Sequence, residues 1–185
     1  MADSLHGKRI AILATDGFEQ VELTEPRKAL DKAGATTEVV SLKSGEIKGW
    51  KFKEWGDTVK VDKTLDQAKV QDYDALLLPG GVMNPDHLRM EPKAVQFVKD
   101  FVGTGRPVAA ICHAPWTLVE ADVVRGKKVT SWPSVKTDLK NAGAHWVDQE
   151  VVTDGQFISS RKPDDIPAFS QALIEALGRA KEKAA

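Results

Sequence analysis

The sequence contains a single cysteine, Cys112, among 185 residues. One cysteine cannot form a disulfide within the chain, so we expect a reducing compartment, the cytoplasm, and a thiol that is either buried and inert or chemically useful. The start of the chain lacks a basic segment followed by a long apolar run, and no later segment approaches about 18 uninterrupted apolar residues. We therefore expect neither a standard secretion signal nor a membrane-spanning helix.

The sequence also lacks an excess of one charge. It carries 26 Lys and Arg residues against 27 Asp and Glu residues, so no broad field is available to attract nucleic acid or anionic lipid. The four histidines are scattered, with no HExxH motif and no paired-cysteine spacing, which argues against a catalytic metal. Gly80-Gly81 lacks the lysine and hydroxyl residue of a phosphate-binding loop, so we expect no nucleotide cofactor and no cofactor of another kind.

Strand and helix patterns alternate along the chain. Short apolar or β-branched runs, typical of buried strands, occur at 9–14, 36–42, 75–78 and 107–112. Apolar residues with helical spacing occur at 21–33, 91–102, 113–121, 135–142 and 166–183. The segments 43–60 and 151–158 are more typical of β-hairpins. This order predicts an α/β fold, a flavodoxin-like three-layer sandwich in which helices cover both faces of a mainly parallel sheet.

Three of the expected strands lead to polar or glycine-rich segments at one edge of this sheet, where ligands collect in such folds. These segments contain Glu19, the pair Gly80-Gly81, and the pair Cys112-His113. Taken singly, each has an ordinary explanation: a core cysteine, a turn, a helix-start histidine and a solvated acid. Glycines let backbone amides approach an oxyanion, however, and a helix start favours a thiolate. Their expected convergence favours a nucleophilic site centred on Cys112.

Several motifs together are similar to those of a known family. They are Gly17-Phe18-Glu19-Gln20-Val21-Glu22-Leu23, Leu78-Pro79-Gly80-Gly81, Ala110-Ile111-Cys112-His113-Ala114-Pro115, Asn141-Ala142-Gly143 and Ser159-Ser160-Arg161. In these motifs the chain resembles the PfpI intracellular protease family, within the class I glutamine amidotransferase-like superfamily that also contains the parkinsonism-associated deglycase. The resemblance covers about 8–177, which we expect to be the core of a single PfpI-like domain spanning 1–185.

The resemblance implies roles for individual residues. Cys112 would be the nucleophile at a strained nucleophile elbow, and His113 would orient or deprotonate it. Glu19 would be the carboxylic acid beside the sulfur, and a protonated Glu19 could donate a hydrogen bond to the thiolate. In protease-like members a neighbouring subunit supplies a further acid, and Asp86 is the matching position here. The resemblance thus implies a homodimer or a higher homo-oligomer.

Four further residues are expected to form the oxyanion or substrate site: Gly80, Gly81, Ala114 and Trp132. Two of them depart from the family pattern. The family usually has glycine after Cys-His, where this chain has Ala114. The deglycase branch has a histidine in the loop where this chain has Trp132, so any role for a histidine falls to His113.

The site is compatible with two classes of function. One is a stress-related, cysteine-dependent enzyme in which Cys112 attacks an electrophilic carbon, either of a peptide bond or of a reactive aldehyde or its adduct. The aldehyde reaction, of the glyoxalase or deglycase type, needs no strong leaving-group catalysis and is less demanding on an incomplete triad. The alternative is a non-catalytic redox sensor or holdase chaperone that responds to oxidation of Cys112.

Overall fold

The computed structural model describes residues 4–184 and has the predicted α/β architecture. Its main sheet has seven strands in the order β11-β12-β8-β7-β1-β3-β6. These are β1 (Arg9–Leu13), β3 (Thr36–Ser41), β6 (Lys63–Thr64), β7 (Ala75–Leu78), β8 (Val108–Ile111), β11 (Val151–Asp154) and β12 (Phe157–Ser160). Every pairing is parallel except that of β11 with β12, which form the hairpin predicted around Asp154-Gly155.

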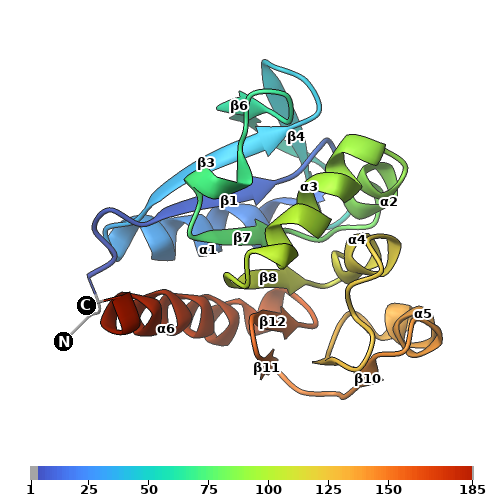
Figure 1. Ribbon diagram of the computed structural model, residues 1–185. Coiled ribbons are helices and arrows are strands. Elements are labelled where there is room, and N and C mark those ends of the chain that lie inside the picture. The colour runs from blue at the N-terminus through green and yellow to red at the C-terminus, as the bar shows by residue number, and fades with distance from the viewer. Residues whose placement is uncertain (1–3, 185) are drawn as a thin grey trace.

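Helices cover both faces of this sheet (Figure 1). Helices α1 (Gln20–Lys32) and α6 (Ile166–Ala184) pack on one face, and α3 (Pro92–Gly103), α4 (Pro115–Glu120) and α5 (Lys136–Asn141) lie on the other. Alternate residues of the buried strands point to the two layers: Ile10 and Ile12 pack with α1 and α6, whereas Ala11 and Leu13 pack with α3 and α4. This burial on both faces explains the continuous apolar runs of β1, β7 and β8.

Two smaller sheets flank the main one. The predicted hairpin at 43–60 is present as β4 (Glu46–Lys51) and β5 (Glu54–Lys60), and β4 also pairs in parallel with β2 (Phe18–Glu19). The second small sheet pairs β9 (Lys128–Val129) with β10 (His145–Trp146). Because β2 follows the carboxyl end of β1, its pairing with β4 brings the hairpin to the sheet edge where Cys112 lies.

Several short elements were not predicted from the sequence. Helix α2 (Met83–Arg89) is absent from the segments with helical spacing given above, and Pro85 lies in its first turn, a position that proline tolerates. Three single-turn 3₁₀ helices occupy connections: η1 (Val70–Asp72), η2 (Pro133–Val135) and η3 (Pro163–Asp165). Such short elements have no sustained apolar period, so neighbouring packing decides their conformation.

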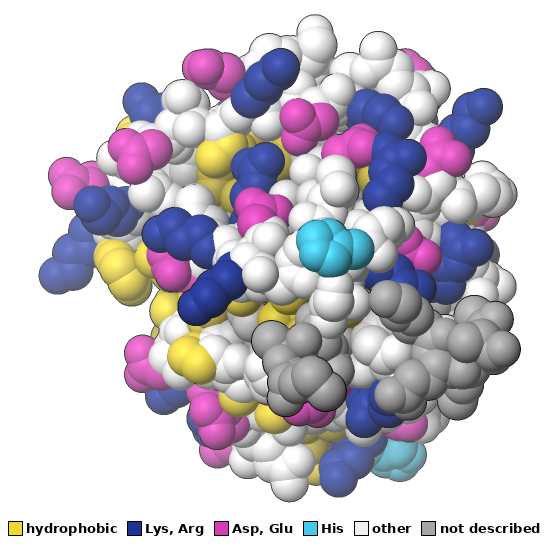
Figure 2. Space-filling model, turned by 90° about the vertical axis from the view of Figure 1, so that its left-hand side faces the viewer, with side chains coloured by type: hydrophobic (Ala, Val, Ile, Leu, Met, Phe, Trp, Pro, Cys, Tyr) yellow, Lys and Arg dark blue, Asp and Glu magenta, His cyan; other side chains and the backbone are white. Residues whose placement is uncertain are grey.

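Basic and acidic side chains are interspersed over the face around the chain termini (Figure 2), in keeping with the near balance of 26 basic and 27 acidic residues. Within residues 4–184, no helix combines the length and the apolar content needed to cross a bilayer. Among the side chains that the structure describes, those of residues 4–180, no group of three or more His, Cys, Asp or Glu is placed to bind a metal ion.

Candidate active site

Cys112 occupies a sharp turn between β8 and α4 and has a backbone φ of 65°. This left-handed conformation costs a residue with a side chain about 1–2 kcal/mol, so neighbouring structure must hold it. The Cys112 N–H donates to the Ser160 carbonyl at 3.0 Å, and its own carbonyl accepts from Trp132 N–H at 2.9 Å. The free thiol is 6% exposed and lies at the edge where the parallel strands end. The geometry is that of a nucleophile elbow.

The carboxyl group next to this sulfur belongs to Glu22, not to Glu19 as we expected. Glu22 lies on the inner face of α1, is fully buried, and accepts a hydrogen bond from Gly80 N–H at 3.1 Å. Glu19 is the last residue of β2, and its side chain turns away to accept a hydrogen bond from Phe52 N–H at 3.2 Å. The reason is geometric: one helical turn after the strand aims Glu22 at the elbow, while Glu19 points along the hairpin.

Glu22 is held in its protonated form at neutral pH. Burial, and after it the neighbouring charge of Glu19, raise its pKa from 4.5 to about 8, although hydrogen bonds from Gly80, Cys112 and Gly81 act in the opposite direction. Its Oε1 is the acceptor for Gly80, whereas Oε2 has no partner of normal hydrogen-bond geometry within the described chain. A carboxylic acid with one unpaired oxygen is therefore poised beside the thiol as a proton donor.

His113 places an uncharged imidazole against the sulfur. Its Nδ1 lies 3.1 Å from Cys112 Sγ, and its Nε2 lies 3.4 Å from Ser134 Oγ. Burial lowers the His113 pKa to about 4, so the imidazole is uncharged at neutral pH. Its ring is stacked on Trp132 at 5.8 Å between ring centroids and is tilted against Trp116 at 5.0 Å. These contacts fix the orientation of the imidazole.

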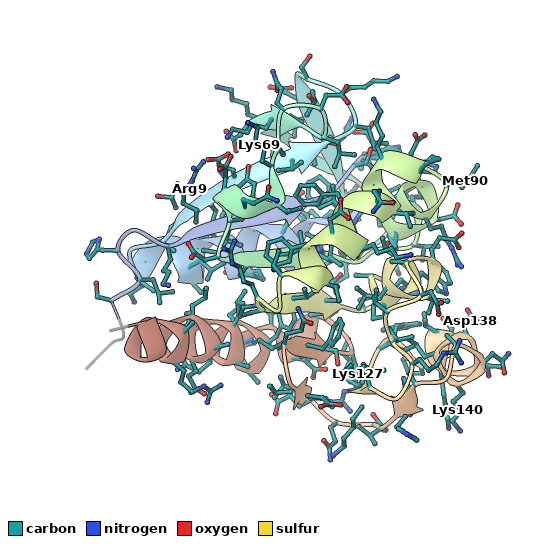
Figure 3. The ribbon with its side chains drawn as sticks, viewed as in Figure 1. Arg9, Lys69, Met90, Lys127, Asp138 and Lys140 are labelled. Carbon is teal, nitrogen blue, oxygen red and sulfur yellow. The ribbon has the colours of Figure 1, made fainter. Side chains whose placement is uncertain are left out.

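A further hydrogen bond anchors Trp116 itself. Its indole N–H donates to the carboxylate of Asp138 on α5 at 2.8 Å, and Asp138 is labelled in Figure 3. The aromatic side chains beside His113 are thus connected to the helix layer behind the site.

Burial also shifts the pKa of the Cys112 thiol. It raises the pKa of Cys112, and the carboxylates of Glu22 and Glu19 raise it further when they are ionised, whereas the backbone N–H groups of Gly81 and His113 lower it. The direction is opposite to the thiolate-favouring effect expected of a helix start. Because Glu22 keeps its proton up to about pH 8, its repulsion of the thiolate is absent at neutral pH. The sulfur is therefore a thiol that needs a base, and His113 Nδ1 is in contact with it.

The glycine pair fits the site through close packing. A Cβ on Gly80 would lie 2.5 Å from Glu22 Oε1 and 2.7 Å from Cys112 Cβ, so no side chain fits between them. Gly81 has a φ of 85°. The loop is also fixed by Asn84, which is fully buried and donates to the carbonyls of Pro79 at 2.9 Å and Gly80 at 3.3 Å.

A cavity of about 600 Å³ opens above the sulfur. Of the residues expected in the site, Cys112, His113, Glu19, Gly81 and Trp132 line it. The remaining lining residues are Glu22, Trp50, Phe52, Val82, Met83 and Pro163.

Three of the residues expected in the site do not line the Cys112 cavity. Gly80 binds Glu22 instead of facing the cavity. Ala114 is buried in the core on the side of α3 and α4, and its N–H donates to the Ile111 carbonyl at 3.1 Å, so this amide is not directed at the site. Asp86 is exposed and lines a different cavity, of about 830 Å³, beside α2, α3 and α4. Within its own chain Asp86 therefore does not belong to the Cys112 site.

The sequence contained an overlooked signal for Glu22. In α1 it lies four residues before Pro26 and eight before Leu30, and both of these are buried with it. A carboxylate on the apolar face of a helix is a candidate for a buried, protonated acid. Asn84 and Phe52 carried no comparable pattern, because α2 and the hairpin tip place them through tertiary contacts.

The chain was compared with models of known protein families. Residues 8–176 match the model described as the DJ-1/PfpI family. This chain belongs to the DJ-1/PfpI family. The resemblance inferred from the sequence motifs is thereby confirmed.

Similar proteins carry several functional names. "Protein/nucleic acid deglycase 2" of Escherichia coli is 46% identical over 92% of this chain and 98% of its own length. "Putative cysteine protease YraA" of Bacillus subtilis is 42% identical over 92% of this chain and 98% of its own. "General stress protein 18" of the same species is 43% identical over 92% of this chain and 98% of its own length. The names of DJ-1/PfpI relatives thus cover deglycase, protease and stress protein.

Solved structures share the fold. Drosophila melanogaster DJ-1beta superposes with a TM-score of 0.84 at 29% identity, over 92% of this chain and 90% of that one. A two-domain protein of Anabaena variabilis, with DJ-1/ThiJ/PfpI-like and ferritin-like domains, gives a TM-score of 0.88 at 35% identity over 92% of this chain. The chain spans about half of that two-domain protein, with 48% covered.

Proposed function

We propose that this DJ-1/PfpI protein is a cysteine-dependent enzyme that converts reactive α-oxoaldehydes such as methylglyoxal, free or as adducts, into hydroxy acids. The observation that carries the proposal is the arrangement around one sulfur: Cys112 on a strained elbow, neutral His113 Nδ1 at 3.1 Å, and the protonated, buried Glu22 on the same cavity. The deglycase name of the Escherichia coli relative supports the same chemistry.

In the first step Cys112 Sγ bonds to the aldehyde carbon. His113 Nδ1 takes the thiol proton and returns it to the carbonyl oxygen, giving a hemithioacetal. A tautomer with its proton on Nε2 suits this task, because it can donate to Ser134 Oγ at 3.4 Å and leaves Nδ1 as the acceptor. The backbone N–H groups of Gly81 and His113, which act on the pKa of the sulfur, are the donors that we assign to the developing oxyanion.

In the second step, by way of an enediol, the proton on the former aldehyde carbon moves to the adjacent ketone carbon, and the hydroxyl proton of the hemithioacetal moves to the ketone oxygen. The first carbon is oxidised to a thioester and the second is reduced to an alcohol, so the electrons balance within the substrate. Water then cleaves the thioester, releases the hydroxy acid and restores the thiol. The overall reaction adds one water to the α-oxoaldehyde, and it requires no external oxidant, metal or organic cofactor.

Peptide hydrolysis is a second candidate, supported by the protease name of the Bacillus subtilis relative. It requires an amine to leave from a tetrahedral intermediate, and therefore efficient protonation of that amine. The acid implied for the protease-like triad, Asp86, does not line the Cys112 cavity of its own chain, so this reaction also needs a neighbouring subunit to complete the site. We therefore rank peptide hydrolysis below the aldehyde reaction.

The test measures lactate formation from methylglyoxal, in parallel with cleavage of a fluorogenic peptide, with Cys112→Ala as the blank for both. We expect lactate formation that depends on Cys112. Peptide release that depends on Cys112, without lactate, would favour the protease. An absence of both activities, together with ready oxidation of the wild-type thiol, would instead support the redox-sensor or holdase alternative.

A further inference from the structure

Phe52 adopts an unusual conformation at the tip of the β4–β5 hairpin. Its φ is 59°, in the left-handed region that favours glycine or asparagine and is strained for a bulky aromatic residue. Its side chain is also 64% exposed. A strained backbone and an exposed apolar ring both work against stability, so neither explains why phenylalanine occupies this position.

Neighbouring groups hold Phe52 in this conformation. Its N–H donates to Glu19 Oε1 at 3.2 Å, and its carbonyl accepts from the indole N–H of Trp50 at 2.9 Å. Trp50 in turn packs edge-on against Trp55 across the hairpin, with ring centroids 5.4 Å apart. Both backbone polar groups of Phe52 are thus fixed by side chains, so the tip is a defined structure.

The Phe52 side chain lines the cavity above Cys112. Around it, the lining is largely apolar and comes from separate parts of the fold: Trp50, Val82, Met83, Trp132 and Pro163. Phe52, Val82 and Trp132 are exposed, whereas Cys112 is buried, so the apolar lining of the cavity extends from the surface to the buried sulfur. Exposed apolar groups gathered at a cavity are typical of a binding site for an apolar ligand.

The charges of the cavity lining also favour an uncharged, apolar ligand. None of the described residues that line it is Lys or Arg, and its titratable groups are the carboxyls of Glu19 and Glu22, the neutral His113 and the Cys112 thiol. An anionic substrate would find no cationic partner and would meet the carboxylate of Glu19. An uncharged substrate with an aromatic group would contact Phe52 and Trp132 through ring packing.

We propose that Phe52 is a specificity residue and that the Cys112 cavity selects uncharged α-oxoaldehydes carrying an aryl group, of which phenylglyoxal is the simplest. This inference rests on the proposed aldehyde reaction and names its preferred substrate class. The covalent steps are those given above: phenylglyoxal and one water give mandelate, with the aldehyde carbon oxidised and the ketone carbon reduced. The aryl ring takes no part in bond making and contributes only binding.

The experiment compares kcat/KM for phenylglyoxal and methylglyoxal in wild type, Phe52→Asn and Phe52→Leu. Mandelate and lactate are measured as products, with Cys112→Ala as the blank, because phenylglyoxal also modifies arginine. We expect Phe52→Asn to lower the phenylglyoxal-to-methylglyoxal ratio of kcat/KM about tenfold, and Phe52→Leu to lower it less. Comparing ratios between variants cancels the intrinsic reactivities of the two aldehydes.

Met90→Asn provides the matched control. Met90 is 74% exposed at the end of α2 (Figure 3), and it does not line the Cys112 cavity. This variant removes an apolar side chain that is at least as exposed as Phe52, and it should leave the ratio unchanged. Since asparagine tolerates a positive φ, the Tm of Phe52→Asn should equal or exceed that of wild type.

An unchanged ratio in Phe52→Asn, or a marked fall in its Tm, would overturn the specificity role. Either result, combined with lactate formation that depends on Cys112, leaves the proposed function standing. Failure of wild type to form either product above the Cys112→Ala blank would instead refute the proposed function itself.

Discussion

At the scale of single residues, the chemistry depends on which atoms carry protons. Glu22, Cys112 and His113 are all buried, and burial favours the uncharged form of each. The site at neutral pH therefore holds a carboxylic acid, a thiol and a free imidazole. In the proposed reaction, transfer of one proton from Cys112 to His113 generates the attacking sulfur within this neutral set.

The pH dependence of turnover should follow from these groups. Because Glu22 loses its proton near pH 8 and His113 gains one near pH 4, kcat/KM should be level between these values and fall on either side. Above pH 8 a carboxylate beside the sulfur opposes formation of the thiolate. Glu22→Gln keeps a neutral donor and cannot ionise, so the alkaline fall assigned to Glu22 should disappear. Glu19→Gln is the control, and disappearance of the fall in that variant instead would assign it to Glu19.

Gly80 should tolerate no side chain. In Gly80→Ala the new Cβ would meet Glu22 Oε1 at 2.5 Å and the Ile111 carbonyl oxygen at 2.6 Å. We expect a loss of about 1–3 kcal/mol in the free energy of unfolding, measured by urea denaturation, together with loss of turnover. Gly103→Ala is the control: it lies in α3 with no atom within 4 Å of a new Cβ, and its stability should be unchanged or slightly higher. Equal stabilities of the two variants would contradict the packing argument.

At the scale of elements, short connections supply the walls of the cavity. The single turn η3 brings Pro163 to the cavity and is held by Asp165, which is buried and accepts hydrogen bonds from Arg161 N–H at 2.9 Å and Arg161 Nε at 3.0 Å. This pair closes the connection between β12 and α6. This part of the wall therefore depends on a charged residue, Asp165, that does not itself line the cavity.

Asp165→Asn should loosen this turn. It replaces the carboxylate that accepts from the Arg161 backbone and guanidinium, and we expect a loss of about 1–3 kcal/mol in stability. Asp164→Asn is the matched control in the same turn, because the Asp164 side chain is 83% exposed and its contact with Lys162 is 3.9 Å long. That change should stay within about 0.5 kcal/mol. Thermal unfolding of both variants checks the difference, and similar losses would refute the role of Asp165.

At the scale of the whole molecule, the position of Asp86 bears on assembly. It is exposed on α2 and lies outside the Cys112 cavity of its own chain, so it can act on a sulfur only across a subunit contact. This agrees with the implied role of a neighbouring acid, which stays a prediction together with the homo-oligomer itself.

Subunit complementation tests this role. If Asp86 acts on the partner's sulfur, Cys112→Ala and Asp86→Ala should each be inactive alone. An equimolar mixture, unfolded and refolded together, should then recover about a quarter of the wild-type sites, because half of randomly paired dimers are mixed and each mixed dimer holds one intact site. Full activity of Asp86→Ala alone, or no recovery on mixing, would exclude a role for Asp86 across subunits.

The sequence alone was sufficient for the order of the longer strands and helices, the mainly parallel sheet, the family and the position of Cys112 after β8. These features follow from local patterns: buried strands are continuous apolar runs, and strands that alternate with helices form parallel sheets. The motif around Cys112 is contiguous, so it could be read directly from the chain.

Only the tertiary structure decided which acid meets the sulfur and what surrounds it. Glu19 and Glu22 are three residues apart, and the choice between them depends on where β2 ends and how α1 is rotated against the elbow. Phe52 reaches the cavity because β4 pairs with β2, a contact between segments about 30 residues apart. Such placements depend on packing between distant segments, which leaves no periodic signal in the sequence, whereas burial by that same packing sets the protonation of Glu22 and His113.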